Sequence, residues 1–139
     1  MEMKNSLTIL LIEDDQIEVM KFNRTISKLD LKHKVIEAKN GEEALEILSI
    51  KDKRPDIILL DLNMPKMNGI EFLTILKKDE ELKYIPTIIL STSSNHKDLL
   101  ECYKIGIAGY MIKPLKYEEY MKSIEKVLSY WSVNALITV

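Results

Sequence analysis

The sequence has few of the residues that mark disulfide-rich or zinc-binding proteins. It contains one cysteine, Cys102, and two histidines, His33 and His96, among 139 residues. A single cysteine excludes an intramolecular disulfide, and without a Cys/His cluster there is no zinc-binding pattern. A reducing compartment is therefore expected, with Cys102 as a small buried residue and both histidines as solvated or locally hydrogen-bonded groups.

Long apolar runs and an excess of basic residues are also missing. No apolar run approaches the roughly 20 residues needed to span a bilayer, and Met1–Ser6 lack the apolar core of a signal peptide. The 20 Lys and Arg residues are balanced by 22 Asp and Glu residues. These features predict a cytoplasmic protein with no membrane or nucleic-acid partner.

What is present fits one compact soluble domain. The chain is 46% hydrophobic and 30% charged, and a chain of this length can bury roughly two-thirds of its unfolded surface. We expect one domain over residues 1–131. Residues 132–139 are expected to form an apolar C-terminal extension, with no output domain after it. The extension is expected either to fold back on its own domain or to form a homodimer contact through an extended last helix or an added strand.

Short Ile/Leu-rich runs alternate with amphipathic stretches from one end of the chain to the other, which is typical of βα units around a parallel sheet. The runs predict buried strands over residues 7–12, 35–38, 56–60, 87–90 and 110–112. Apolar residues spaced three and four apart predict helices over residues 17–29, 42–50, 70–78, 97–105 and 117–131. Right-handed crossovers favour an α/β doubly wound sheet with strand order 2-1-3-4-5, although periodicity alone does not fix that order.

Polar groups follow four of the predicted strands. They are Glu13-Asp14-Asp15, Asp61, Ser91-Thr92 and Lys113-Pro114. In the proposed order the first and third strands are neighbours, so Asp14 and Asp61 would lie about one strand spacing, roughly 5 Å, apart. Carboxylates this close repel each other unless a cation lies between them, and hard oxygen ligands suit Mg²⁺. The residues therefore predict a magnesium site, while Asp15 is predicted to cap the following helix.

This spaced set resembles the receiver domains of bacterial two-component response regulators. The motifs are the acidic pair, Asp61-Leu62-Asn63-Met64-Pro65 with Gly69 after it, a hydroxyl residue, and Lys113-Pro114. The resemblance extends from about Thr8 to Leu128. It implies a flavodoxin-like fold with five strands and five helices, and a protein switched by phosphorylation.

The resemblance also implies a role for each matching residue. Asp61 is the expected phosphoacceptor, Lys113 is expected to pair with the phosphorylated carboxylate, and the Ser91 hydroxyl is expected to bond a phosphoryl oxygen. The Lys113–Pro114 peptide bond is expected to be cis, as in the family. Four groups are the expected Mg²⁺ ligands: Glu13, through water, Asp14, Asp61 and the backbone carbonyl of Asn63.

Ser91 and Tyr110 match the residues that move together when receivers are switched. The implied output is a changed face made of the helix at 97–105, the strand at 110–112 and the helix at 117–131. Thr92 stands where many receivers carry Ala, which leaves the lifetime of the phosphorylated state open.

The expected partners are a sensor histidine kinase or phosphotransfer protein and a downstream protein target. A long, Trp-bearing last helix and the Ser-Thr-Ser run at 91–93 resemble the stand-alone regulators paired with bacterial phytochromes. Such a protein catalyses only its own phosphorylation and dephosphorylation, so it is not expected to be an enzyme in the ordinary sense.

Two other functions use similar residues or a similar fold, and the sequence disfavours both. A Mg²⁺-dependent phosphohydrolase of the aspartyl-phosphate type also uses an Asp nucleophile, but such enzymes usually carry a second Asp where this chain has Asn63. A flavodoxin-like electron carrier needs a phosphate-binding loop after the first strand, where Glu13-Asp14-Asp15 would repel phosphate.

Overall fold

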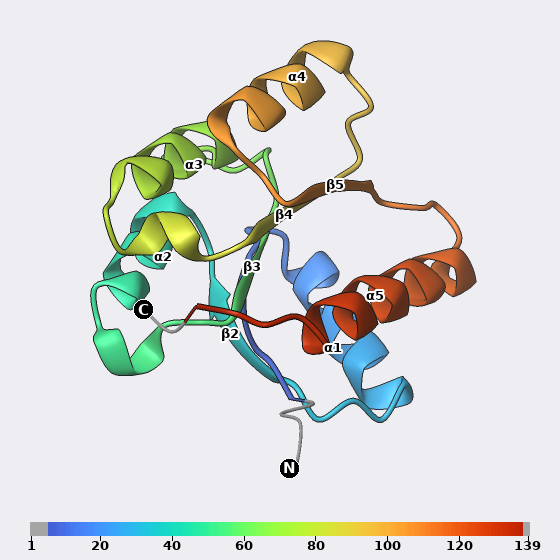
Figure 1. Ribbon diagram of the computed structural model, residues 1–139. Helices are drawn as coiled ribbons and strands as arrows, with labels where there is room; N and C mark the ends of the chain where they lie inside the picture. Colours follow the sequence, from blue (N-terminus) through green and yellow to red (C-terminus); the bar gives the residue numbers. More distant parts are fainter. Residues whose placement is uncertain (1–5, 138–139) are drawn as a thin grey trace.

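A five-stranded parallel sheet forms the centre of the molecule. The computed structural model describes residues 6–137, and within them the strand order is β2-β1-β3-β4-β5, as predicted (Figure 1). The strands are β1 Thr8–Ile12, β2 Lys34–Ala38, β3 Ile57–Leu60, β4 Thr87–Ser91 and β5 Gly109–Ile112.

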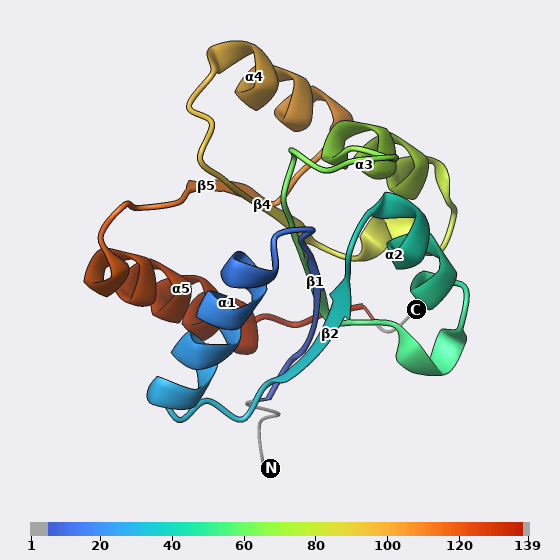
Figure 2. The same ribbon diagram turned by 180° about the vertical axis from the view of Figure 1, so that it is seen from behind.

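Five α-helices cover the two faces of the sheet. They are α1 Gln16–Lys28, α2 Gly41–Leu48, α3 Gly69–Lys78, α4 His96–Ile105 and α5 Tyr117–Ser132, with 3₁₀ helices η1 Lys51–Lys53 and η2 Leu82–Tyr84. One apolar cluster packs α2, α3 and α4 against the sheet, and a second packs α1 and α5 against the other face (Figures 1 and 2). The fold class predicted from the sequence is therefore confirmed.

The register of the sheet brings the ends of its strands to one edge. Ile12, the last residue of β1, lies opposite Leu60, the last residue of β3. Ser91 lies opposite Ile112, and the Lys113 N–H donates to the Ser91 carbonyl at 2.8 Å. Because parallel strands all end at the same edge, the chain delivers Glu13, Asp61 and Lys113 to one place.

Side-chain caps set the helix starts. Asp15 accepts a hydrogen bond from the Ile17 N–H at 2.9 Å, which confirms its predicted role. Asn40, Asn68 and Asn95 cap α2, α3 and α4 in the same way. The prediction that α2 continues to residue 50 was wrong, because the helix ends at Leu48 and the Ser49 hydroxyl bonds the Glu46 carbonyl at 2.6 Å.

The described part of the C-terminal extension folds back on its own domain. It runs beneath the sheet, past the amino end of β3 (Figure 1), and Leu136 packs against the same apolar cluster as Trp131. Ile137 is 64% exposed, and residues 138–139 lie outside the described residues. A homodimer contact stays a prediction. Within residues 6–137 no helix is both long and apolar enough to cross a membrane.

The half-buried His33 predicts a pH-dependent stability. Its Nδ1 accepts the Leu7 N–H at 2.9 Å, and burial lowers the pKa of His33 below 6.5. A lowered folded-state pKa gives stability that is complete above about pH 6.5 and is lost as the pH falls. His33→Asn keeps an acceptor and carries no charge, so from pH 7 to pH 5 the wild type should lose about 0.5–1 kcal/mol relative to this variant.

Urea unfolding at a series of pH values measures this difference, with the exposed His96→Asn as the control that should keep the wild-type profile. Parallel profiles for the wild type and His33→Asn would contradict the prediction.

Candidate functional site

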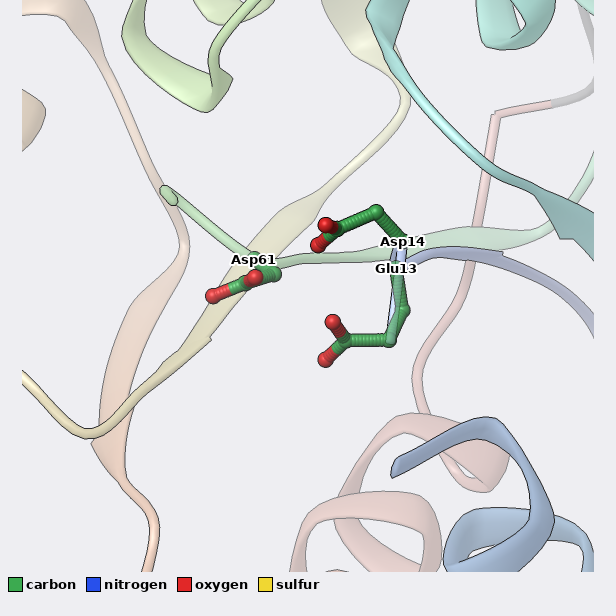
Figure 3. A group of neighbouring side chains, drawn as sticks. All are labelled: Glu13, Asp14 and Asp61. Carbon is green, nitrogen blue, oxygen red and sulfur yellow. The ribbon is translucent and has the colours of Figure 1, made fainter. Parts of the chain in front are cut away.

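Three carboxylates converge at the carboxyl edge of the sheet. Oxygens of Glu13, Asp14 and Asp61 all lie within 4.8 Å of one another, and the side chains face a common space (Figure 3). Glu13 and Asp14 follow β1 and Asp61 follows β3, so the pairing of these strands creates the cluster. The expected proximity of Asp14 and Asp61 is confirmed.

Lys113 is the cation of this site. Its side chain is 8% exposed, and Nζ lies 2.9 Å from Glu13 Oε1 and 3.6 Å from Glu18 Oε1. In this structure the ammonium group thus pairs with Glu13 and not with Asp61. Glu18 could not be predicted as part of the site, because nothing in the spacing of the chain shows that the first turn of α1 faces the end of β5.

The expectation of a cis Lys113–Pro114 bond was wrong, since this bond is trans. The trans form is the more stable one for most X–Pro bonds by about 0.5–1 kcal/mol.

The surroundings of Asp61 disfavour its ionised form. Burial and then repulsion by Glu13 raise the pKa of Asp61 to about 7, against the opposing effects of Lys113 and of a backbone hydrogen bond from Asn63. For Lys113, burial alone would lower the pKa, but the hydrogen bond and attraction of Glu13, helped by Glu18, outweigh it and raise the pKa. The site therefore carries more negative charge than Lys113 neutralises.

This donor set fits a hard divalent cation. Three carboxylates offer only oxygen ligands, and their mutual repulsion would be relieved by two positive charges. Asn63 follows Asp61 by two residues and is exposed. That its backbone carbonyl binds Mg²⁺ stays a prediction.

A hydrogen-bond network joins Ser91 to Tyr110. The buried Ser91 hydroxyl accepts the Ser93 N–H at 3.1 Å, and the Tyr110 hydroxyl donates to the Ser93 carbonyl at 2.9 Å. The Ser93 hydroxyl in turn donates to Asp98 of α4 at 3.2 Å. Ser93 was not among the predicted site residues, although the Ser-Thr-Ser run contained it. Thr92, between them, is exposed.

Gly69 fixes the loop that follows Asp61. Its N–H donates to the Leu62 carbonyl at 3.0 Å. A Cβ at this position would lie 2.6 Å from the Asp61 carbonyl oxygen and 2.7 Å from Leu62 Cα. The start of α3 thus packs directly on the backbone of the Asp61 segment, which only glycine permits.

Comparison with known proteins places this site in a family. The family model described as "Response regulator receiver domain" matches residues 9–125. The probable methanogenesis regulatory protein FilR2 of Methanothrix harundinacea is 32% identical over 135 residues, covering 94% of this chain and 87% of FilR2. Response regulator Rcp1 of a Synechocystis strain is 30% identical over 128 residues, covering 88% of this chain and 87% of Rcp1.

Solved structures agree with the sequence relatives. The phosphorylated cyanobacterial phytochrome response regulator RcpA superposes with a TM-score of 0.87 at 29% identity, covering 96% of this chain and 99% of RcpA. The Mn²⁺-bound form of Rcp1 superposes with a TM-score of 0.85 at 29% identity, covering 94% of this chain and 99% of Rcp1. With its fold, its converging acids and these relatives, the chain belongs to the receiver-domain family of two-component response regulators.

Proposed function

We propose that this chain accepts a phosphoryl group on Asp61 in a Mg²⁺-dependent reaction, with a sensor histidine kinase or phosphotransfer protein as the donor. The observation that carries the proposal is the group of Glu13, Asp14 and Asp61 beside the buried ammonium of Lys113. The relatives RcpA and Rcp1 support it, since one is described as phosphorylated and the other as Mn²⁺-bound.

The chemistry requires a nucleophile and stabilisation of charge on the transferring group. An Asp61 carboxylate oxygen attacks the donor phosphorus, and a new P–O bond forms. The bond from phosphorus to the donor nitrogen or oxygen breaks, and the donor leaves with that electron pair. Lys113 and the Ser91 hydroxyl would each contact a non-bridging oxygen, so Lys113 has to move away from its partner Glu13.

Glu13, Asp14, Asp61 and the Asn63 carbonyl are the groups that would hold Mg²⁺. When bound, the metal supplies positive charge to the oxygens of the phosphoryl group. It would also lower the pKa of Asp61 and so favour the ionised nucleophile.

The Ser93 network suggests how phosphorylation would reach the surface. A Ser91 hydroxyl that turns to a phosphoryl oxygen gives up the bond from the Ser93 N–H, and Ser93 is the residue that holds Tyr110 and Asp98. We therefore propose that the signal leaves through the α4-β5-α5 face. These three elements carry the exposed side chains Tyr103, Ile112 and Tyr130, at 53%, 48% and 60%. A cytoplasmic location also stays a prediction.

Incubation with acetyl phosphate and Mg²⁺ tests the proposal. Intact-protein mass spectrometry should show one added phosphoryl group on the wild type and none on Asp61→Asn, and hydroxylamine should remove the label, as expected for an acyl phosphate. Asp52→Asn, an exposed substitution in η1, is the control that should label normally. Equal labelling of the wild type and Asp61→Asn would refute the assignment.

A further inference from the structure

Lys113 lies between two glutamates that come from different elements. Glu13 follows β1, whereas Glu18 belongs to the first turn of α1 and is 23% exposed. Their Oε1 atoms lie 2.9 Å and 3.6 Å from Lys113 Nζ. Only Glu13 is part of the carboxylate cluster with Asp14 and Asp61.

Glu18 also pairs with a second lysine, Lys21, through its other carboxylate oxygen. Its second carboxylate oxygen, Oε2, lies 3.7 Å from Lys21 Nζ, and the same Nζ lies 4.2 Å from the centre of the buried Tyr120 ring. A cation over an aromatic face is attracted to it. The α5 helix therefore fixes Lys21, Lys21 pairs with Glu18, and Glu18 faces Lys113.

Two cations would compete for the single negative charge of Glu13. It neutralises Lys113, and it belongs to the set that would hold a divalent cation. A metal and an ammonium group that share one carboxylate repel each other. Glu18 gives Lys113 a second carboxylate partner that does not belong to the cluster of Glu13, Asp14 and Asp61. The ammonium group can therefore stay paired when Glu13 binds the metal.

We propose that Glu18 is a positioning residue that takes over Lys113 from Glu13 and so allows a divalent cation to bind beside a lysine. The inference rests on the proposed function, because it assumes that the carboxylate cluster binds Mg²⁺. It adds a role that the acids of the cluster and Lys113 do not fill. Loss of Glu18 leaves the ammonium group competing with the metal for Glu13.

A double-mutant cycle on Mg²⁺ affinity tests the inference. Isothermal titration calorimetry with MgCl₂ alone gives the dissociation constant of the wild type, Glu18→Gln, Lys113→Met and the double variant. Glu18→Gln should raise the constant about three- to tenfold when Lys113 is present, as expected for coupled charges in one network. With Met at position 113 the same substitution should change the constant by less than about twofold.

The cycle separates positioning from a general effect of charge. If Glu18 acts only through its negative field, Glu18→Gln weakens Mg²⁺ binding equally in both backgrounds, which overturns the inference. No change in either background overturns it too. Glu119→Gln is the matched control, because Glu119 is the third residue of α5 as Glu18 is the third of α1, and it is exposed. It should leave the Mg²⁺ constant unchanged.

Two further measurements keep the result interpretable. Thermal melts identify any unfolded variant, and Lys113→Gln replaces Lys113→Met if the latter does not fold. A wild type that neither binds Mg²⁺ nor takes a label from acetyl phosphate refutes the proposed function and this inference together. If the wild type binds Mg²⁺ and takes the label, but Glu18→Gln has the same Mg²⁺ dissociation constant as the wild type, only the inference about Glu18 is refuted.

Discussion

Without divalent metal at pH 8, Asp61→Asn is expected to be more stable than the wild type by about 1–2 kcal/mol. The substitution removes a charge that burial and Glu13 both disfavour. The expected gain is smaller than the full pKa shift would give, because the half-buried carboxylate is partly screened by water. A carboxylate whose removal stabilises the fold is expected at a site that binds a cation.

The pH dependence of this difference follows from the sign of the shift. The pKa of Asp61 is raised from 3.8 to about 7, so the folded wild type takes up a proton more readily than the unfolded chain does. The destabilisation is complete above about pH 7 and declines as the pH falls toward 4. The advantage of Asp61→Asn should therefore stay constant between pH 8 and about pH 7 and shrink steadily from there to pH 5.

Urea unfolding in EDTA across this pH range measures the effect. Saturating Mg²⁺ should stabilise the wild type at pH 8 and narrow its gap to Asp61→Asn, because the cation relieves the same repulsion and binds only the folded state. If Asp61→Asn were less stable than the wild type at pH 8 in EDTA, burial and repulsion at Asp61 would not be destabilising the fold.

Gly69→Ala is expected to lose about 2–4 kcal/mol of stability and to impair phosphoryl uptake. The added Cβ would lie 2.6 Å from the Asp61 carbonyl oxygen and 2.7 Å from Leu62 Cα. Both contacts are with backbone, which cannot rotate away as a flexible side chain can. Either α3 or the Asp61 segment has to shift, and a shift of the latter would misplace Asp61, the proposed phosphoacceptor.

Gly109→Ala in β5 is the matched control for Gly69→Ala. Its Cβ would meet Ile88 Cγ2 at 3.9 Å, an ordinary contact. This control should remain within about 1 kcal/mol of the wild type, as measured by urea unfolding, and should label with acetyl phosphate. Equal effects of the two substitutions would show that the close approach at Gly69 is not the cause.

Much of the fold could be predicted from local patterns. The Ile/Leu runs of β1, β3 and β4 are buried on both faces, and buried parallel strands have this composition. Helix ends were predicted less well, as α2 shows, because a serine that bonds its own helix leaves no periodic signal.

Contacts between distant elements could not be predicted in this way. Glu18 and Lys113 are 95 positions apart, and their proximity depends on how α1 packs beside the end of β5. The role of Ser93 depends on Tyr110, which approaches it from a neighbouring strand. Nor does sequence composition show that Leu136 returns to the core.

The sequence by itself indicated the strands, the alternating helices and the edge at which Asp14, Asp61, Ser91 and Lys113 lie, because periodicity locates the strand ends and connection rules favour the order 2-1-3-4-5. The tertiary structure decided which charges pair. Lys113 lies nearest to Glu13, which follows β1, and to Glu18, which belongs to α1, and α1 packs with α5 on one face of the sheet. Electrostatic energies depend on distance and burial, and both are properties of the folded chain.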